Sequence, residues 1–204
     1  MKWEARCSIA SNKQAFYTLN TVKELEMAGI FAYRCGSCDE IHEGSPSFGF
    51  DEPDHYACLT DEQKAVNARI TSDFCEITFE DRTDFFIRAL LEVPIHGVSE
   101  PFLWGVWVSI SQKSYERYVE TYDAPVEGDG FFGWVCNSIP WYPETRNLAS
   151  DIYVQTVGLR PLLRLHSGNT DDHPLILDQV NGITAAKAQQ IAEFVLHTAT
   201  AAAT

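Results

Sequence analysis

The stretch that most constrains the fold is "PFLWGVWVSI", residues 101–110. Along a β-strand, successive side chains point to opposite faces, and here large side chains fall on both. One face would carry Phe102, Trp104, Val106, Val108 and Ile110, and the other would carry Leu103, Gly105, Trp107 and Ser109. Such a strand is typical of a sheet that is covered on both sides. We therefore expect a sheet-based core around this segment.

Several other apolar runs predict strands. "FCEITFE" and "DFFIRALLEVP" are separated by the turn-like "DRT", which predicts a hairpin. Further strand candidates are "IFAYR", "FFGWVCN", "DIYVQTV" and "PLLRLH". The Gly-, Pro- and Asp-rich "EGSPSFGFDEPDHYACL" predicts a long loop. "IPWYPET" is also expected to be a loop, because Pro140 and Pro143 would interrupt a strand ladder.

Helices are predicted mainly from capping signals. Thr60 and Gln63 form a capping box before "DEQKAVNARI", Ser111 precedes "QKSYERYVETY", and Thr184 precedes an amphipathic C-terminal helix. Ile191, Phe194 and Val195 supply the apolar stripe of that last helix. A further helix is expected within residues 12–28.

Together these elements predict an α+β fold with a mainly antiparallel central sheet, flanking helices and an N-terminal Cys/His turn. Residues 1–30 are expected to form an N-terminal helical extension. Residues 31–197 would form a single α+β domain, and residues 198–204 an Ala-rich tail.

Charge and hydropathy limit the classes of binding partner that we expect. The chain has 204 residues and a net charge of −14, from 15 basic and 29 acidic side chains. Nucleic-acid binding needs a clustered basic surface, so it is not expected, whereas a basic protein would suit this charge. No stretch approaches the ~18 apolar residues of a membrane span, and "MKWEARCSIASNKQ" lacks a signal-peptide core. We expect a cytoplasmic protein whose six cysteines stay reduced.

The most informative chemistry lies in "YRCGSCDEIHEG", residues 33–44. Cys35 and Cys38 have the C-x2-C spacing that lets two thiolates bind one ion from a tight turn, and Gly36 allows the backbone to fold closely. His42 follows four residues after Cys38 and would add a nitrogen ligand. This pattern is half of a zinc motif.

A structural zinc site needs a fourth ligand. The leading candidate is Cys75, on a strand that could run past the turn, and Cys58 and His55 are the alternatives. Without a metal, the cysteines would be an ordinary reduced pair with a solvated His42. A thioredoxin-like redox role is not favoured, because such sites enter a helix and Gly44 and Pro46 prevent one here.

Other polar and aromatic stretches have simpler interpretations. Asp171 and Asp172 beside His173 could orient a general base, but adjacent residues rarely face one another and a turn is expected. Arg88 and Arg160 lie on or beside apolar strands and are expected to pair with carboxylates. The aromatic residues are expected to be mainly core: Trp104, Trp107, Trp134, Trp141 and Tyr142.

Several segments together resemble an uncharacterised bacterial domain-of-unknown-function family. They are "CGSCDEIHEG", "FGFDEPDHY", "TSDFCEI", "FFIRALLEVPI", "PFLWGVWVSIS", "FFGWVCNSIPWYPET", "GLRPLLRL" and "DHPLILDQVNGIT", within residues 31–195. The resemblance implies no known activity. It implies that the Cys pair, the following His and a Cys at the position of Cys75 are family features, which supports a site of Cys35, Cys38, His42 and Cys75.

Three functions remain open at this point. The first is a non-enzymatic binding protein with a structural zinc site, for which immunity proteins and antitoxins are an analogy only. The second is a metal-dependent, hydrolase-type enzyme with an open zinc site, using Glu40 or Glu43 as base. The third is a metal-free scaffold domain. No complete catalytic constellation is present in the sequence, and the oligomeric state is not predicted.

Overall fold

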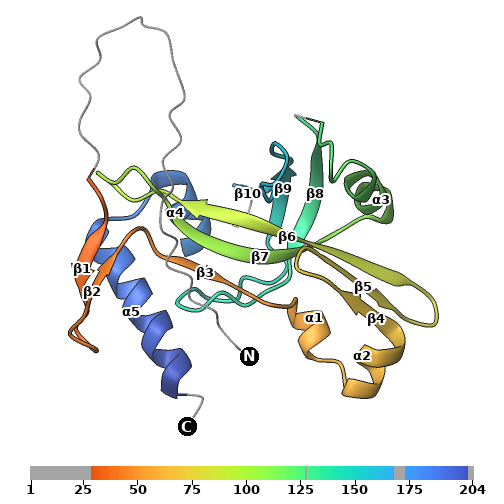
Figure 1. Ribbon diagram of the computed structural model, residues 1–204, viewed down its shortest axis with the longest axis horizontal. Helices are drawn as coiled ribbons and strands as arrows, with labels where there is room; N and C mark the ends of the chain where they lie inside the picture. Colours follow the sequence, from red (N-terminus) through yellow and green to blue (C-terminus); the bar gives the residue numbers. More distant parts are fainter. Residues whose placement is uncertain (1–28, 127, 168–172, 202–204) are drawn as a thin grey trace, which may run out of the picture.

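The computed structural model describes residues 29–126, 128–167 and 173–201. In chain order the elements are β1 (Ala32–Arg34), β2 (Ile41–Glu43), β3 (Ser47–Gly49), α1 (Asp54–Ala57), α2 (Asp61–Asn67), β4 (Ala68–Ile70), β5 (Phe74–Thr78), β6 (Thr83–Val93), β7 (Phe102–Ile110), α3 (Gln112–Glu120), β8 (Gly130–Val135), β9 (Ala149–Tyr153), β10 (Leu162–Leu165), α4 (Pro174–Asn181) and α5 (Ala185–Ala201). The predicted α+β class is confirmed (Figure 1).

The central sheet has eight strands in the order β3-β7-β8-β9-β10-β6-β5-β4. Because β6 also pairs with β7, the strands from β6 to β10 close on themselves. Two pairings are parallel, β3 with β7 and β10 with β6, whereas the other pairings of this sheet are antiparallel. The mainly antiparallel central sheet that we expected is therefore corrected to a mixed, closed one.

Closure depends on the length of β6. This eleven-residue strand pairs with β7 from Phe85 to Val93. On its other edge it pairs first with β5, from Thr83 to Ile87, and then with β10 at Leu90 and Leu91. Alternation of apolar residues shows which face of a strand is buried, but it does not show that one edge has two successive partners.

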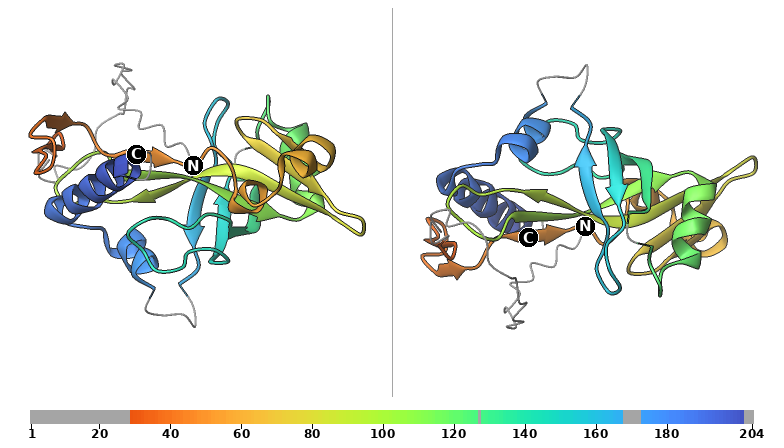
Figure 2. Two further views of the ribbon diagram at one scale, coloured as in Figure 1. Left: turned by 90° about the horizontal axis from the view of Figure 1, so that it is seen from below. Right: turned by 90° about the horizontal axis from the view of Figure 1, so that it is seen from above.

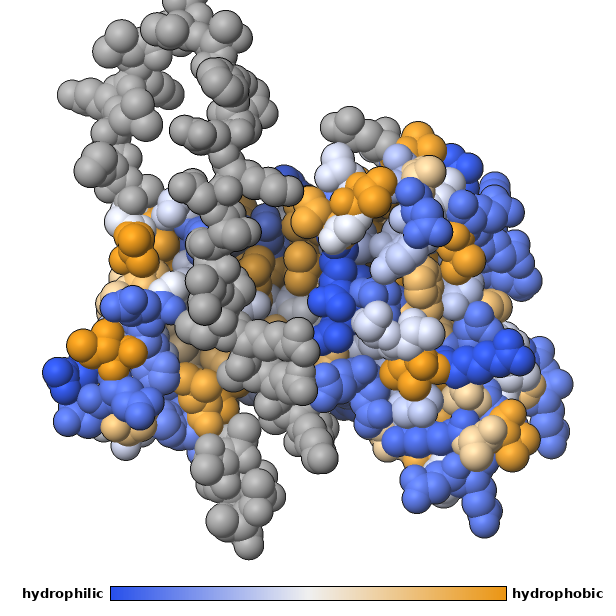
Figure 3. All heavy atoms as spheres, viewed as in Figure 1, coloured by the Kyte–Doolittle hydropathy of each residue, from blue (hydrophilic) through white to orange (hydrophobic). Residues whose placement is uncertain are grey.

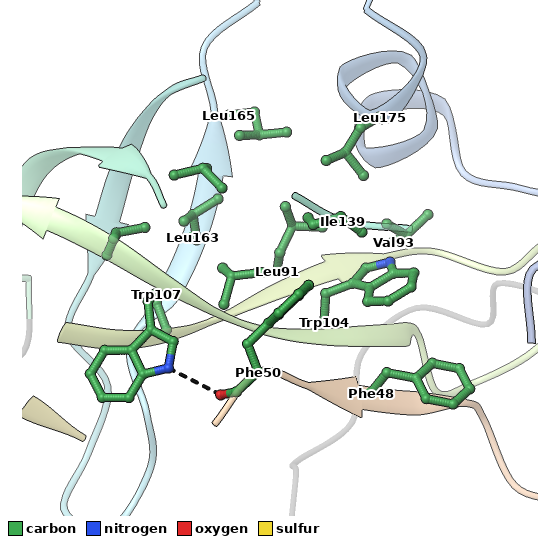
Figure 4. Packing of buried hydrophobic residues seen from close by; sticks show 14 of the residues in the cluster. Phe48, Phe50, Leu91, Val93, Trp104, Trp107, Ile139, Leu163, Leu165 and Leu175 are labelled. Carbon is green, nitrogen blue, oxygen red and sulfur yellow. Dashed lines mark hydrogen bonds between the residues drawn. The ribbon is translucent and has the colours of Figure 1, made fainter. Parts of the chain in front are cut away.

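The core lies on both faces of β7, as the alternation predicts. Trp104 and Trp107 are both fully buried. The Nε1–H of Trp107 donates a hydrogen bond of 3.0 Å to the backbone carbonyl of Phe50, which gives its one polar atom a partner inside the core (Figure 4). The expectation of a covered central strand is confirmed.

Three segments differ from the prediction. The helix expected over "DEQKAVNARI" ends at Asn67, and the last three residues of that segment form β4. The loop expected over residues 43–59 contains β3 and the short helix α1. In β3, Phe48 lies opposite Trp104. The expected turn at His173 is instead the N-cap of α4, with Pro174 in its first turn. Proline is favoured at that position because its missing N–H would have no helical partner there.

The predicted helix caps are confirmed. Thr60 and Gln63 form a reciprocal capping box on α2, and the Ser111 side chain accepts from the Ser114 N–H on α3. The Thr184 side chain accepts from the Lys187 N–H at the start of α5. The helix predicted within residues 12–28 lies outside the described residues.

The C-terminal helix α5 packs with one apolar face. Its buried side chains are Ala188, Ile191, Ala192 and Val195. Phe194, expected in this stripe, is 42% exposed. The helix continues to Ala201, into the segment predicted as a tail.

The two ends of the molecule are built from different helices and strands. The separate β1–β2 hairpin lies beside α5 at one end, whereas β4, β5 and α2 lie at the other (Figures 1 and 2). On the face shown in Figure 3, hydrophilic side chains predominate at the α2 end, with isolated hydrophobic ones between them. Within the described ranges, no helix is both long and apolar enough for a membrane span.

Candidate metal centre

The Cys/His turn is the tip of the β1–β2 hairpin. In the hairpin register, Tyr33 lies opposite His42 and Arg34 opposite Ile41. The turn is closed by a 2.8 Å hydrogen bond from the Cys35 N–H to the Glu40 carbonyl and by a 3.0 Å bond from the Asp39 N–H to the Cys35 carbonyl. This folding brings both cysteines of the C-x2-C spacing to one side of the turn.

Cys35, Cys38 and His42 converge. One ligand atom from each lies within 4.8 Å of the others, and Cys38 Sγ is 3.4 Å from His42 Nε2. Zinc bonds of about 2.3 Å to sulfur and about 2.05 Å to nitrogen, at a tetrahedral angle, place such a sulfur and nitrogen about 3.6 Å apart. The observed spacing therefore matches two ligands of one ion.

Backbone N–H groups of the turn point at the sulfur of Cys35. The Ser37 N–H lies 3.4 Å from this Sγ. Burial raises the pKa of Cys35, but backbone hydrogen bonds from Cys38 and Ser37, helped by His197, lower it from 9.0 to about 6. The turn thus favours a thiolate, which is the form that binds metal.

The pKa of Cys38 is shifted in the opposite direction. A backbone hydrogen bond from Glu40 lowers its pKa, but desolvation and the neighbouring Cys35 outweigh that effect, so the pKa of Cys38 is raised. The two pKa shifts have opposite directions, so the turn favours a first thiolate more than a second. A divalent cation would remove the repulsion that keeps the second proton in place.

The His42 imidazole is held by a neighbouring ring. It stacks on Tyr33, with ring centroids 5.1 Å apart and an interplanar angle of 24°. Tyr33 is 9% exposed and belongs to the core cluster, so the hairpin presents His42 from a packed support. A ligand whose orientation is already set costs less entropy to fix on binding.

The structure does not bring Cys75 to these three residues. Cys75 is fully buried on β5, opposite Phe86 of β6, at the far end of the molecule from the β1–β2 hairpin (Figure 1). Burial raises its pKa to about 12, with Glu52 adding to the effect. Cys75 is therefore a core thiol. The strand that carries it does not run past the Cys/His turn, as the prediction required.

The alternative fourth ligands also lie elsewhere. Cys58 is an exposed free thiol just after α1. The His55 ring contacts Phe86, with centroids 5.4 Å apart. Neither belongs to the Cys35, Cys38 and His42 group.

The C-terminal helix supplies contacts that sequence reasoning missed. His197 Nε2 lies 3.0 Å from Cys35 Sγ. A Glu193 carboxylate oxygen accepts a 2.8 Å hydrogen bond from the Gly36 N–H, and hydrogen bonds from Gln189 and Gly36 lower the pKa of Glu193. The signal available in the sequence was the four-residue spacing of Gln189, Glu193 and His197, which puts them on one helix face.

Among the residues that the structure describes, the other candidates form no second group of metal-binding side chains. Asp171 and Asp172 lie outside the described residues, and His173 caps α4, with its Nε2 3.2 Å from the Glu144 carbonyl. Arg160 pairs with Asp73 at 2.6 Å, as expected. The expected burial is wrong for two aromatic residues, Trp134 and Trp141, which are 44% and 41% exposed.

A mixed, closed sheet with a Cys/His hairpin defines this chain as an α+β protein with a candidate metal centre. The family model described as "Uncharacterized protein conserved in bacteria (DUF2199)" matches residues 34–183. The chain therefore belongs to this family, and the resemblance inferred from the sequence is confirmed. The matched range includes Cys35, Cys38 and His42 and ends before α5. No curated protein and no solved structure matches the chain.

Proposed function

We propose that this protein is a non-enzymatic interaction protein that binds one zinc ion through Cys35, Cys38 and His42, and that the ion has a structural role. The observation that carries the proposal is the convergence of these three ligand atoms within 4.8 Å. Two thiolates and an imidazole bind zinc in preference to hard cations such as Mg²⁺ or Ca²⁺.

A structural role is favoured by where the ligands lie. They sit at the tip of a two-stranded hairpin, which is marginally stable by itself. An ion bound to both strands' ends would hold the hairpin closed, because ligands from β2 and from the turn after β1 would be joined. The net charge of −14 suits a basic protein as partner.

An open, catalytic zinc would instead keep a water on the ion inside a cleft. Glu40 and Glu43, the bases considered for that function, are both exposed on the hairpin. The surface hollow beside the turn is lined by Ser37, Trp141, Gln190, Glu193, Phe194, His197 and Thr198. Exposed carboxylates on a hairpin are open to water and are not enclosed in a cleft with the ion.

The test is the metal content of the purified, untagged chain. We expect one zinc per chain, a loss of zinc in Cys38→Ser and unchanged zinc in the matched control Cys58→Ser, since both cysteines are exposed. Zinc present at a hundredfold excess over its Kd stabilises by about 2.7 kcal/mol, so chelation should lower the melting temperature by about 5–11 °C. Less than about a tenth of an equivalent of any metal would reject the proposal.

A further inference from the structure

We propose that His197 of α5 is the fourth ligand of this zinc ion, so that the site is a closed Cys2His2 centre that fastens the β1–β2 hairpin to the C-terminal helix. This inference rests on the proposed zinc site and adds to it the ligand that decides between a closed and an open ion. It replaces Cys75, which lies at the other end of the molecule (Figure 1).

The first support is distance. His197 Nε2 lies 3.0 Å from Cys35 Sγ, and Cys38 Sγ lies 3.4 Å from His42 Nε2. A tetrahedral zinc ion places each sulfur–nitrogen pair about 3.6 Å apart. The pair within the hairpin is close to this separation. The pair that joins the hairpin to the helix is shorter, which places His197 within ligand reach of Cys35.

The second support is that a whole face of α5 is directed at the turn. Gln189, Glu193 and His197 follow one another at intervals of four residues, so they lie along one stripe of the helix. The Gln189 amide donates to the Arg34 carbonyl at 3.3 Å, and Glu193 accepts from the Gly36 N–H. Contacts at three successive turns fix the register of the helix against the hairpin.

The third support is the freedom of the imidazole. His197 is only partly buried, near the end of α5, and contacts the cluster from the Cys35 side. The group whose ligand atoms all lie within 4.8 Å of one another is Cys35, Cys38 and His42, so the His197 ring would have to rotate toward the ion to complete four-coordination. A shallow hollow that includes Ser37 and His197 leaves room for this rotation.

The consequence is a metal-dependent link between distant parts of the chain. Cys35 and His197 are 162 positions apart. Binding one ion to both adds the free energy of metal binding to the docking of α5. The Trp141 ring packs on Phe194 of the same helix, at 5.7 Å between centroids, and so reports on that docking.

The test compares the wild-type 204-residue chain with His197→Ala and with the matched control His166→Ala. His166 is an exposed histidine paired with Asp151 on β9. Each apoprotein is titrated with Co²⁺, whose visible absorption reports the ligand set, and zinc affinity is measured by chelator competition. We expect His166→Ala to match wild type. We expect His197→Ala to bind one equivalent with an altered Co²⁺ spectrum and at least about tenfold weaker zinc affinity.

An unchanged spectrum and affinity in folded His197→Ala would overturn this inference while leaving the three-ligand site intact. If wild type itself binds no metal, the proposed function fails instead, so the two failures are distinct. Far-UV circular dichroism checks that the variant folds. If it does not, X-ray absorption of the zinc-loaded wild type decides, because the outer-shell scattering of each ring counts the imidazole ligands. Two sulfurs with two imidazoles support the inference, and two sulfurs with a single imidazole oppose it.

Discussion

Replacing Gly133 with alanine should destabilise the protein, because neighbouring atoms leave no room for a Cβ at this position. Gly133 of β8 pairs with Ile110 of β7 on one side and with Ser150 of β9 on the other. A Cβ at this position would lie 2.7 Å from the Ser109 carbonyl oxygen and 2.8 Å from Cδ1 of Ile152. The first of these atoms belongs to the backbone of a central strand, so it cannot move without disturbing the ladder.

The magnitude follows from two opposing effects. Overpacking of a core costs about 1–3 kcal/mol, and a backbone clash belongs in the upper part, about 2–3 kcal/mol. Alanine also reduces the freedom of the unfolded chain, which recovers about 0.4–1 kcal/mol. The net loss for Gly133→Ala is therefore about 1–2.6 kcal/mol in the free energy of unfolding, or about 2–10 °C in melting temperature.

The assay is urea unfolding followed by tryptophan fluorescence, since Trp104 and Trp107 are fully buried. The matched control is Gly29→Ala, where the nearest atom to a new Cβ is the Gly97 carbonyl oxygen at 3.8 Å, an ordinary contact. The control should not lose stability. If Gly133→Ala unfolds at the same urea concentration as the control, then β7, β8 and β9 are not packed as described.

Two further predictions concern local interactions. Burial raises the pKa of Asp73, but hydrogen bonds from Ser72 and Arg160 lower it overall. Asp73 therefore stabilises the fold above about pH 4, the range in which the unfolded carboxyl is ionised, and loses this effect as the pH falls through its lower folded pKa. Arg160→Met should cost about 1 kcal/mol at pH 7, and its stability curve should converge with wild type in acid; a constant gap down to pH 2 would contradict the pairing. Thr60→Ala should cost about 1 kcal/mol by removing the capping box of α2, measured by thermal unfolding, and no change would show that this cap contributes nothing.

Local signals in the sequence were reliable guides to local structure. Thr60, Ser111 and Thr184 each cap the helix that they predict, because a cap needs only a side chain and an N–H two or three residues away. The alternation along β7 correctly predicted a strand buried on both faces. The parallel pairings of β3 and β10 were not predictable in this way, because the partner strands are distant in the sequence.

The candidate site shows the same contrast between local signals and contacts of distant segments. Cys35, Cys38 and His42 are found by spacing, since a single turn holds all three. Cys75 was proposed because it lies on a predicted strand that could run past the turn, but its side chain belongs to the core. His197 belongs to another segment of the chain, and only the packing of α5 on the hairpin brings it to Cys35.

The most direct test of the metal centre is a crystal structure of the protein as purified, with anomalous diffraction recorded above and below the zinc absorption edge. We predict a single anomalous peak enclosed by Cys35, Cys38 and His42 that disappears below the edge. Clear density for these side chains with no peak between them, or a zinc peak elsewhere on the molecule, would contradict the account.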